Sequence, residues 1–155
     1  MKDQLIETWL INNRVNLLLL DAINDSVCCS AFRGEMDTSP CMKFRLMHNV
    51  RYWRLDKIGR EFIEGQRLFE KDKEYSRDMI RYQLIKSSEA VAKILECGYK
   101  KMGELKGYPR GVFTFFGYLI SYESHLRGQI ILTLNQSGYS LPQSVHYGMW
   151  NWNKI

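Results

Sequence analysis

The chain has 155 residues, of which 45% are hydrophobic and 25% charged, with a formal net charge of +5. This composition predicts one domain, residues 1–155, with a core of its own, and excludes a disordered or low-complexity chain. The uncharged run at residues 111–122 is too short to cross a bilayer, and no secretory signal is recognisable. We therefore expect a soluble, cytoplasmic protein without a membrane partner.

The excess of basic residues raises the question of nucleic-acid binding. Basic and acidic residues alternate, as in residues 70–81, and no helix-turn-helix, RNP or Cys/His finger pattern is present. We interpret the charge as that of solvated helix faces and expect no nucleic-acid partner.

The cysteines at positions 28, 29, 41 and 97 lack the spacing of a zinc site, and in a cytoplasmic protein we expect them to be reduced. The adjacent Cys28 and Cys29 are either a thiol site or small residues that fill a tight connection.

The first predicted helix covers residues 3–23, where apolar residues recur every three or four positions: Ile6, Trp9, Leu10, Leu17 and Leu20. Three asparagines in its middle, at positions 12, 13 and 16, are poor helix formers. They are either exposed or hydrogen-bonded inside the fold.

The second predicted helix follows a polar connection, residues 24–39. Ser39 suits the N-cap and Pro40 the first helical position. The helix is expected to end near residue 56, with an apolar stripe of Met42, Leu46, Val50 and Trp53. Residues 57–73 predict a crossover with a short helical piece, long enough that the helices it joins need not be antiparallel neighbours.

Two more helices are predicted, over residues 75–102 and 109–138. Their apolar stripes are Ile80, Leu84, Ser88, Val91 and Leu95 in the third, and Phe115, Leu119, Tyr122, Leu126 and Ile130 in the fourth. Gly138 suits the position after a helix because glycine tolerates positive φ. In the tail, residues 139–155, Trp150 and Trp152 are expected either to cap the end of the bundle or to cover a partner subunit. No strand pattern is present, so the predicted fold class is all-α.

Four stretches carry a family resemblance: WLINNRVNLLLLDAI at 9–23, MHNVRYWRL at 47–55, YESHLRGQI at 122–130 and GYSLPQSVHYGMWNW at 138–152. Together they resemble the DinB/YfiT-like superfamily, and the RGQI string is the most specific part. The resemblance implies an up-up-down-down four-helix bundle with a long crossover and a short aromatic C-terminal tail. It also implies a homodimer, and a nickel or zinc ion held by one histidine of the second helix and two of the fourth. Relatives include thiol-dependent transferases and isomerases.

The chain departs from that pattern at all three positions that would ligate the metal. They are occupied by Leu46, Tyr122 and Leu126. Leucine cannot bind a metal and a neutral tyrosine is a poor ligand, so we predict no metal and no cofactor, and a degenerate site that forms an apolar pocket with one hydroxyl. The Tyr122 hydroxyl either lines this pocket or fills the vacated volume and donates one hydrogen bond.

The three histidines do not rebuild the site in a helical projection. At about 100° per residue, His48 points roughly 200° away from Leu46, and His125 lies roughly 80° from the mean direction of Tyr122 and Leu126. His146 lies in the tail. His48 and His125 remain weaker candidates.

Neighbours of these histidines have structural interpretations. Glu123 is two positions from His125, so the two do not share a helical face and form a poor acid–base pair. His125 is expected at the surface or in a dimer interface, Arg127 is interpreted as structural, and Gly128 is expected to permit the close approach of a neighbouring helix.

Two functional hypotheses follow. The first is a DinB-like homodimer without the family's metal that binds a small ligand in the bundle pocket. The alternative is a metal-dependent thiol S-transferase or isomerase that uses nickel or zinc, with ligands drawn from His48, His125, a carboxylate or Tyr122. No catalytic residue is identified.

Overall fold

The computed structural model describes residues 1–28, 39–71 and 73–155. This part of the chain forms helices and no strand, which confirms the all-α fold class. The elements are α1 (Lys2–Asp21), α2 (Asp25–Cys28), α3 (Pro40–Ile58), the 3-10 helix η1 (Arg60–Phe62), α4 (Arg77–Lys100), α5 (Gly111–Gln136) and α6 (Gln143–Trp150). Within the same residues, no helix has the length and apolar character needed to cross a bilayer.

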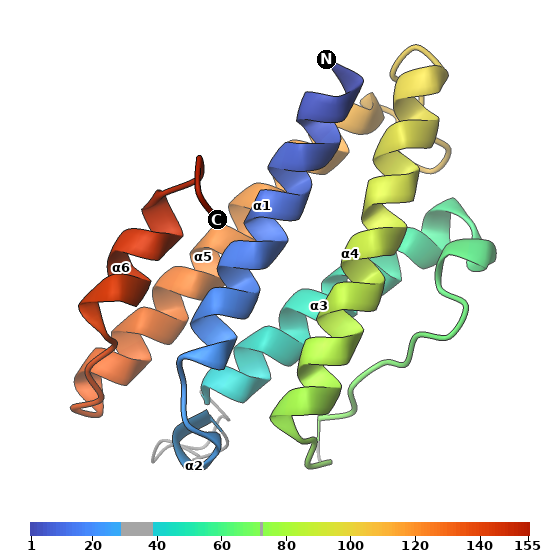
Figure 1. Cartoon of the computed structure of the whole chain (residues 1–155). Coiled ribbons are helices and arrows are strands. Elements are labelled where there is room, and N and C mark those ends of the chain that lie inside the picture. Colours follow the sequence, from blue (N-terminus) through green and yellow to red (C-terminus); the bar gives the residue numbers. More distant parts are fainter. Residues whose placement is uncertain (29–38, 72) are drawn as a thin grey trace.

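The four long helices α1, α3, α4 and α5 pack side by side, and α6 lies against α1. Figure 1 shows that α1 and α5 run in one direction and that α3 and α4 run in the other. The order is therefore up-down-down-up, and the expected up-up-down-down order is wrong. The chain reverses between α1 and α3, and the long crossover returns it to start α4 parallel to α3.

Local chemistry explains where several helices begin and end. The Ser39 hydroxyl accepts a hydrogen bond from the Met42 amide at 3.2 Å, with Pro40 at the first helical position, as predicted. Ser76 caps α4 in the same way, through the Met79 amide. Gly138 follows α5 with a φ of 78°, which glycine adopts without strain.

The tail differs from its prediction. It forms the helix α6, and Trp150 is 85% exposed, so this side chain does not cap the bundle. Trp152 is half-buried against the core.

The interior has three layers along the bundle. One apolar cluster includes Leu19, Phe44, Leu84 and Ile130, and a second, nearer the other end, includes Trp9, Leu55, Ile94 and Phe115. On each long helix, buried polar residues lie at and around the change from one cluster to the other, namely Asn12, Asn13, Asn16, His48, Arg51, Gln83, Ser87, Ser88, Glu123 and Arg127. We call these residues the polar layer.

Most of the predicted apolar stripe of α3 does not face the core. Met42 and Leu46 are only half-buried and Trp53 is 48% exposed, whereas His48 and Arg51 are fully buried. Polar side chains can be buried when their hydrogen bonds are satisfied. The polar layer supplies those bonds, so the inner face of α3 is more polar than its periodicity indicates.

The expectation that the cysteines are reduced is wrong for two of them. Cys28 and Cys41 form a disulfide that joins the end of α2 to the first turn of α3, with their Cα atoms 5.1 Å apart. That separation lies within the range of disulfides, and sequence spacing does not reveal it. The hypothesis of a thiol site at Cys28 is thereby excluded in this state, and Cys29 lies outside the described residues. Cys97 is free and exposed.

Candidate functional site

An ion pair between Arg51 of α3 and Glu123 of α5 forms the centre of the polar layer. Arg51 Nε and Nη2 donate to the two carboxylate oxygens of Glu123 at 2.6 and 2.8 Å. Both side chains are almost fully buried, with 0% and 1% exposed. A two-pronged guanidinium–carboxylate pair of this kind fixes orientation as well as distance.

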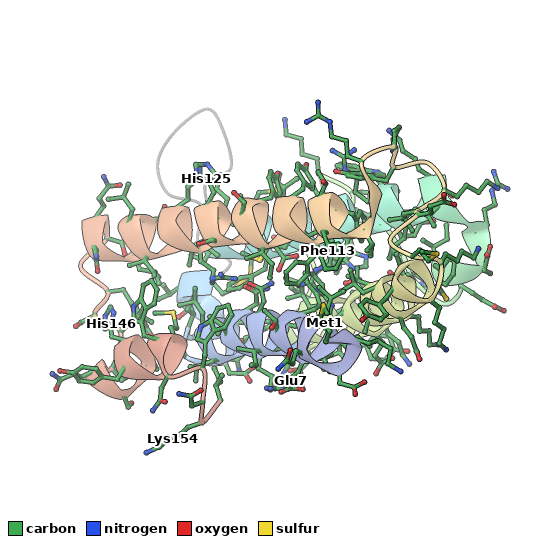
Figure 2. The ribbon with its side chains drawn as sticks, turned by 90° about the horizontal axis from the view of Figure 1, so that it is seen from above. Met1, Glu7, Phe113, His125, His146 and Lys154 are labelled. Atoms are coloured by element: carbon green, nitrogen blue, oxygen red, sulfur yellow. A yellow bond between two sulfur atoms is a disulfide. The ribbon has the colours of Figure 1, made fainter. Side chains whose placement is uncertain are left out.

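The asparagines of α1 complete this pair from a third helix. Asn12 and Asn16 each donate to Glu123 Oε2 at 2.7 Å, and their side-chain oxygens accept from Arg127 Nη1 at 2.9 and 2.6 Å. Figure 2 shows side chains filling the space between α1 and α5. The asparagines are thus hydrogen-bonded inside the bundle, one of the two arrangements expected from the sequence, and Arg127 is structural as predicted.

The third nitrogen of Arg51 extends the contacts to α4. Arg51 Nη1 donates to the Leu84 carbonyl at 2.9 Å and to the Asn13 side chain at 2.9 Å. The guanidinium also lies 4.8 Å from the Trp9 ring centre, a cation–π contact. Since Glu123 already accepts four hydrogen bonds, it is not available as a general base. The polar layer holds four helices in register.

The ring of His48 contacts backbone carbonyls of the crossover and of α4. Its Nε2 lies 2.8 Å from the Arg67 carbonyl oxygen and its Nδ1 3.1 Å from that of Gln83. The neighbouring Asn49 donates to the Phe69 carbonyl and accepts from the Phe69 amide, at 2.8 and 2.9 Å. Burial lowers the pKa of His48 to about 4, although its two carbonyl neighbours act in the opposite direction. Both ring nitrogens face backbone, so His48 is not a free metal ligand.

The other two histidines are exposed and take no part in the polar layer. His125 is exposed on the side of α5 turned away from α1, with its Nε2 2.8 Å from the Gln129 side-chain nitrogen, and His146 is exposed on α6 (Figure 2). Among the described residues, no three His, Cys, Asp or Glu side chains gather closely enough to hold a metal ion.

The three predicted pocket residues lie where α3 meets α5. Leu46 and Tyr122 are half-buried and pack against both apolar clusters, whereas Leu126 is 2% exposed and belongs to one of them. Tyr122 stacks on Tyr118 with ring centres 5.9 Å apart. Its hydroxyl makes no hydrogen bond to any described residue, and burial raises its pKa, so the group stays protonated. The predicted single hydrogen bond is therefore not found.

Two hollows flank Trp53 on the outer side of α3. The first has a volume of about 280 Å³, and its walls include Leu46, Met42 and Phe69. The second, of about 500 Å³, is lined by Val50, Trp53, Arg54, Asp56, Lys57 and Tyr118. The Arg54 guanidinium lies 4.6 Å from the Tyr118 ring centre, so its position is held by a cation–π contact. Trp53 lines both hollows, and we call the two together the groove of α3.

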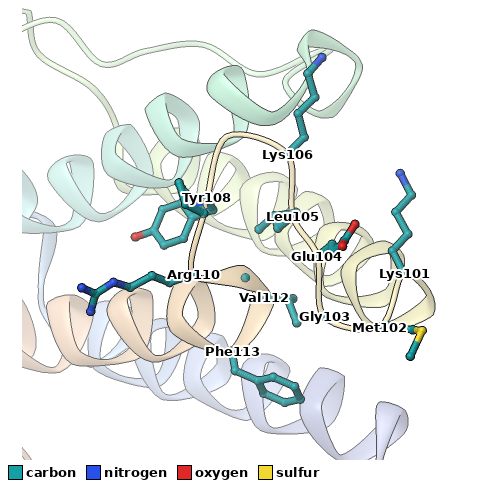
Figure 3. Close-up of a pocket in the computed structure, with 12 residues that line it drawn as sticks. Lys101, Met102, Gly103, Glu104, Leu105, Lys106, Tyr108, Arg110, Val112 and Phe113 are labelled. Atoms are coloured by element: carbon teal, nitrogen blue, oxygen red, sulfur yellow. The ribbon is translucent and has the colours of Figure 1, made fainter.

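A third hollow, of about 740 Å³, lies in the loop between α4 and α5. In Figure 3 the Arg110 side chain extends to one side and those of Lys101 and Lys106 extend together in another direction, so the three do not converge in the hollow. Since a ligand site needs polar groups that converge, this hollow has no arrangement suited to a particular ligand.

Of the three predicted pocket residues only Leu46 lines one of the two hollows beside α3, and the prediction missed Trp53, Arg54 and Tyr118, which line them. The periodicity of α3 predicts Trp53 in the core, and nothing in the sequence pairs Arg54 with a tyrosine of another helix. A scan against family models, a search of curated proteins and a search of solved structures each gave no match.

Proposed function

We propose that the chain is a metal-independent, DinB-like helical bundle that binds a small, mainly apolar ligand in the groove along the outer side of α3. The resemblance rests on the sequence motifs. It gains support from the roles of His48, Asn49, Arg51, Glu123 and Arg127, which belong to the similar strings and join helices to one another or to the crossover.

The observation that carries the proposal is the character of the three positions that correspond to metal ligands. Leu46 and Tyr122 present half-buried apolar surface, and Leu126 is closed into the core. The hollow beside Leu46 has a volume of about 280 Å³, close to the lower end of small-molecule sites at roughly 300 Å³. Trp53, 48% exposed, supplies a flat surface shared by both hollows.

Binding of anilinonaphthalene sulfonate, an apolar aromatic anion, tests this site. We expect saturable binding that Trp53→Ala weakens at least about tenfold, because the variant removes the wall common to both hollows. Trp150→Ala is the matched control, since this exposed tryptophan lies on α6. Equal binding by the Trp53 variant and the parent, or no saturable binding, would refute the site.

A further inference from the structure

The outward face of α5 carries no charged residue. Over its 26 residues, all of them described, α5 contains only Glu123 and Arg127 as charged side chains, and both are buried in the polar layer. By contrast, α4 carries eight charged residues over 24 positions, none of them buried. A helix of this length exposes a surface about 39 Å long. So long an uncharged strip is unusual on a chain that is 25% charged.

Large apolar side chains lie near the two ends of this face, and small residues lie between them. Phe113 is 54% exposed and Leu132 is 57% exposed. Between them Gly117, Ser121, Ser124 and Gly128 are all exposed. A Cβ atom at Gly117 or Gly128 would meet nothing within 4 Å. The close helix approach expected at Gly128 therefore does not occur within the described chain.

These six residues form three pairs with a common midpoint, between Tyr122 and Glu123. The pairs are Phe113 with Leu132, Gly117 with Gly128, and Ser121 with Ser124. If a second α5 lay antiparallel across a two-fold axis at this midpoint, each residue would stand level with its pair in the other copy. A two-fold interface has this property, because residue i contacts j and residue j contacts i.

We infer that the outward face of α5 is the interface of a homodimer, in which the α5 helices of two copies pack antiparallel. Because the three pairs are arranged symmetrically about one midpoint, the face matches a second copy of itself, and we take a second copy of this chain as the partner. Charge selects the same partner, because two copies that each carry +5 repel least where neither exposes a charge. Glycine and serine at the centre would let the two helix axes approach closely, while Phe113 and Leu132 pack beside each other at both ends. The outward face of α5 would thus be the contact surface of the homodimer that the resemblance implies. Dimerisation through this face does not require ligand binding in the groove of α3.

Sedimentation velocity over a concentration series tests the interface. We expect a monomer–dimer equilibrium, and Gly128→Arg should raise the dimer dissociation constant roughly a hundredfold, because each copy would bury an unpaired guanidinium. The substitution meets open space, so the monomer should fold normally. For a matched pair, Ser124→Arg should also dissociate the dimer, and Ser144→Arg, at an exposed position of α6, should not.

Cysteine cross-linking tests the antiparallel register, in a background with Cys29 and Cys97 replaced by serine. Ser121→Cys should form a disulfide with its own copy, because the two positions lie only about 4.5 Å apart along the helices. Gly117→Cys alone should not, since its own copy is roughly 16 Å away, but it should cross-link when mixed with Gly128→Cys. A parent that is monomeric up to about 1 mM, or a dimer unaffected by Gly128→Arg, would overturn the inference.

Discussion

Two neighbouring regions of α3 and α5 have opposite characters. In the polar layer, Arg51 and Glu123 are buried, and Arg51 donates a hydrogen bond to each carboxylate oxygen of Glu123. Little more than one helical turn away, Leu46, Tyr122 and Leu126 lie in apolar surroundings, and the one hydroxyl among them has no hydrogen bond to a described residue. Several residues of the strings that carry the resemblance join the helices, whereas the three positions that the resemblance would assign to metal ligands hold half-buried or buried apolar side chains.

The largest expected effect comes from breaking the ion pair of the polar layer. Glu123→Gln keeps the shape of the side chain but leaves Arg51 charged and unpaired in the interior. We expect the free energy of unfolding to fall by about 3–5 kcal/mol. Urea denaturation followed by circular dichroism measures this change.

A matched exposed pair gives the control. Glu7 pairs with Arg14 at the surface, where the side chains are 55% and 40% exposed. Glu7→Gln should lower stability by less than about 1 kcal/mol. If the two variants lost similar amounts, the polar layer would not have the structural role assigned to it.

The next effect concerns pH and His48, which belongs to the polar layer. The pKa of His48 is about 4 in the folded protein against 6.5 as its ordinary value. As the pH falls, the unfolded chain takes up a proton on His48 before the folded protein does. The His48 contribution to the free energy of unfolding should therefore be constant above about pH 6.5 and fall by up to about 3 kcal/mol as the pH drops towards 4.

Unfolding free energies of the parent and of His48→Gln, measured from pH 7 to pH 4, isolate this contribution. The variant should lack the His48 part of the slope, whereas His125→Gln, at an exposed position, should retain it. Parallel pH profiles for the parent and His48→Gln would contradict the expectation.

The smallest effect is expected on the apolar side of the comparison. Because the Tyr122 hydroxyl has no hydrogen bond to a described residue, Tyr122→Phe should change stability by less than about 0.5 kcal/mol. Thermal unfolding is sufficient to check this. A loss of 1 kcal/mol or more would show that the hydroxyl has a structural partner.

Sequence reasoning succeeded where a short segment determines its own structure. The Ser39–Pro40 start of α3, the Gly138 end of α5 and the apolar faces of α4 and α5 needed no knowledge of distant residues. It failed on the inner face of α3, because His48 and Arg51 can be buried only with partners from the crossover, α4 and α5.

The same limit explains the other corrections. The Cys28–Cys41 disulfide depends on how α2 meets α3. The helix α6 packs on α1 so closely that a Cβ atom at Gly148 would lie 2.8 Å from Leu18. For the polar layer a signal did exist, since Asn12, Asn13 and Asn16 in mid-helix are best explained by buried partners.

The central proposal, that Leu46, Tyr122 and Leu126 stand where the DinB-like superfamily holds a metal and that this chain binds none there, is tested most directly by metal content. The parent, purified without chelator and then exposed to nickel, zinc and manganese, should retain less than about a tenth of an equivalent by mass spectrometry. The triple variant Leu46→His, Tyr122→His, Leu126→His restores the pattern of the resemblance and should bind about one equivalent of nickel or zinc. Near-stoichiometric metal in the parent, or none in the triple variant, would contradict the account. The first of these results would make the metal-dependent thiol transferase the leading hypothesis.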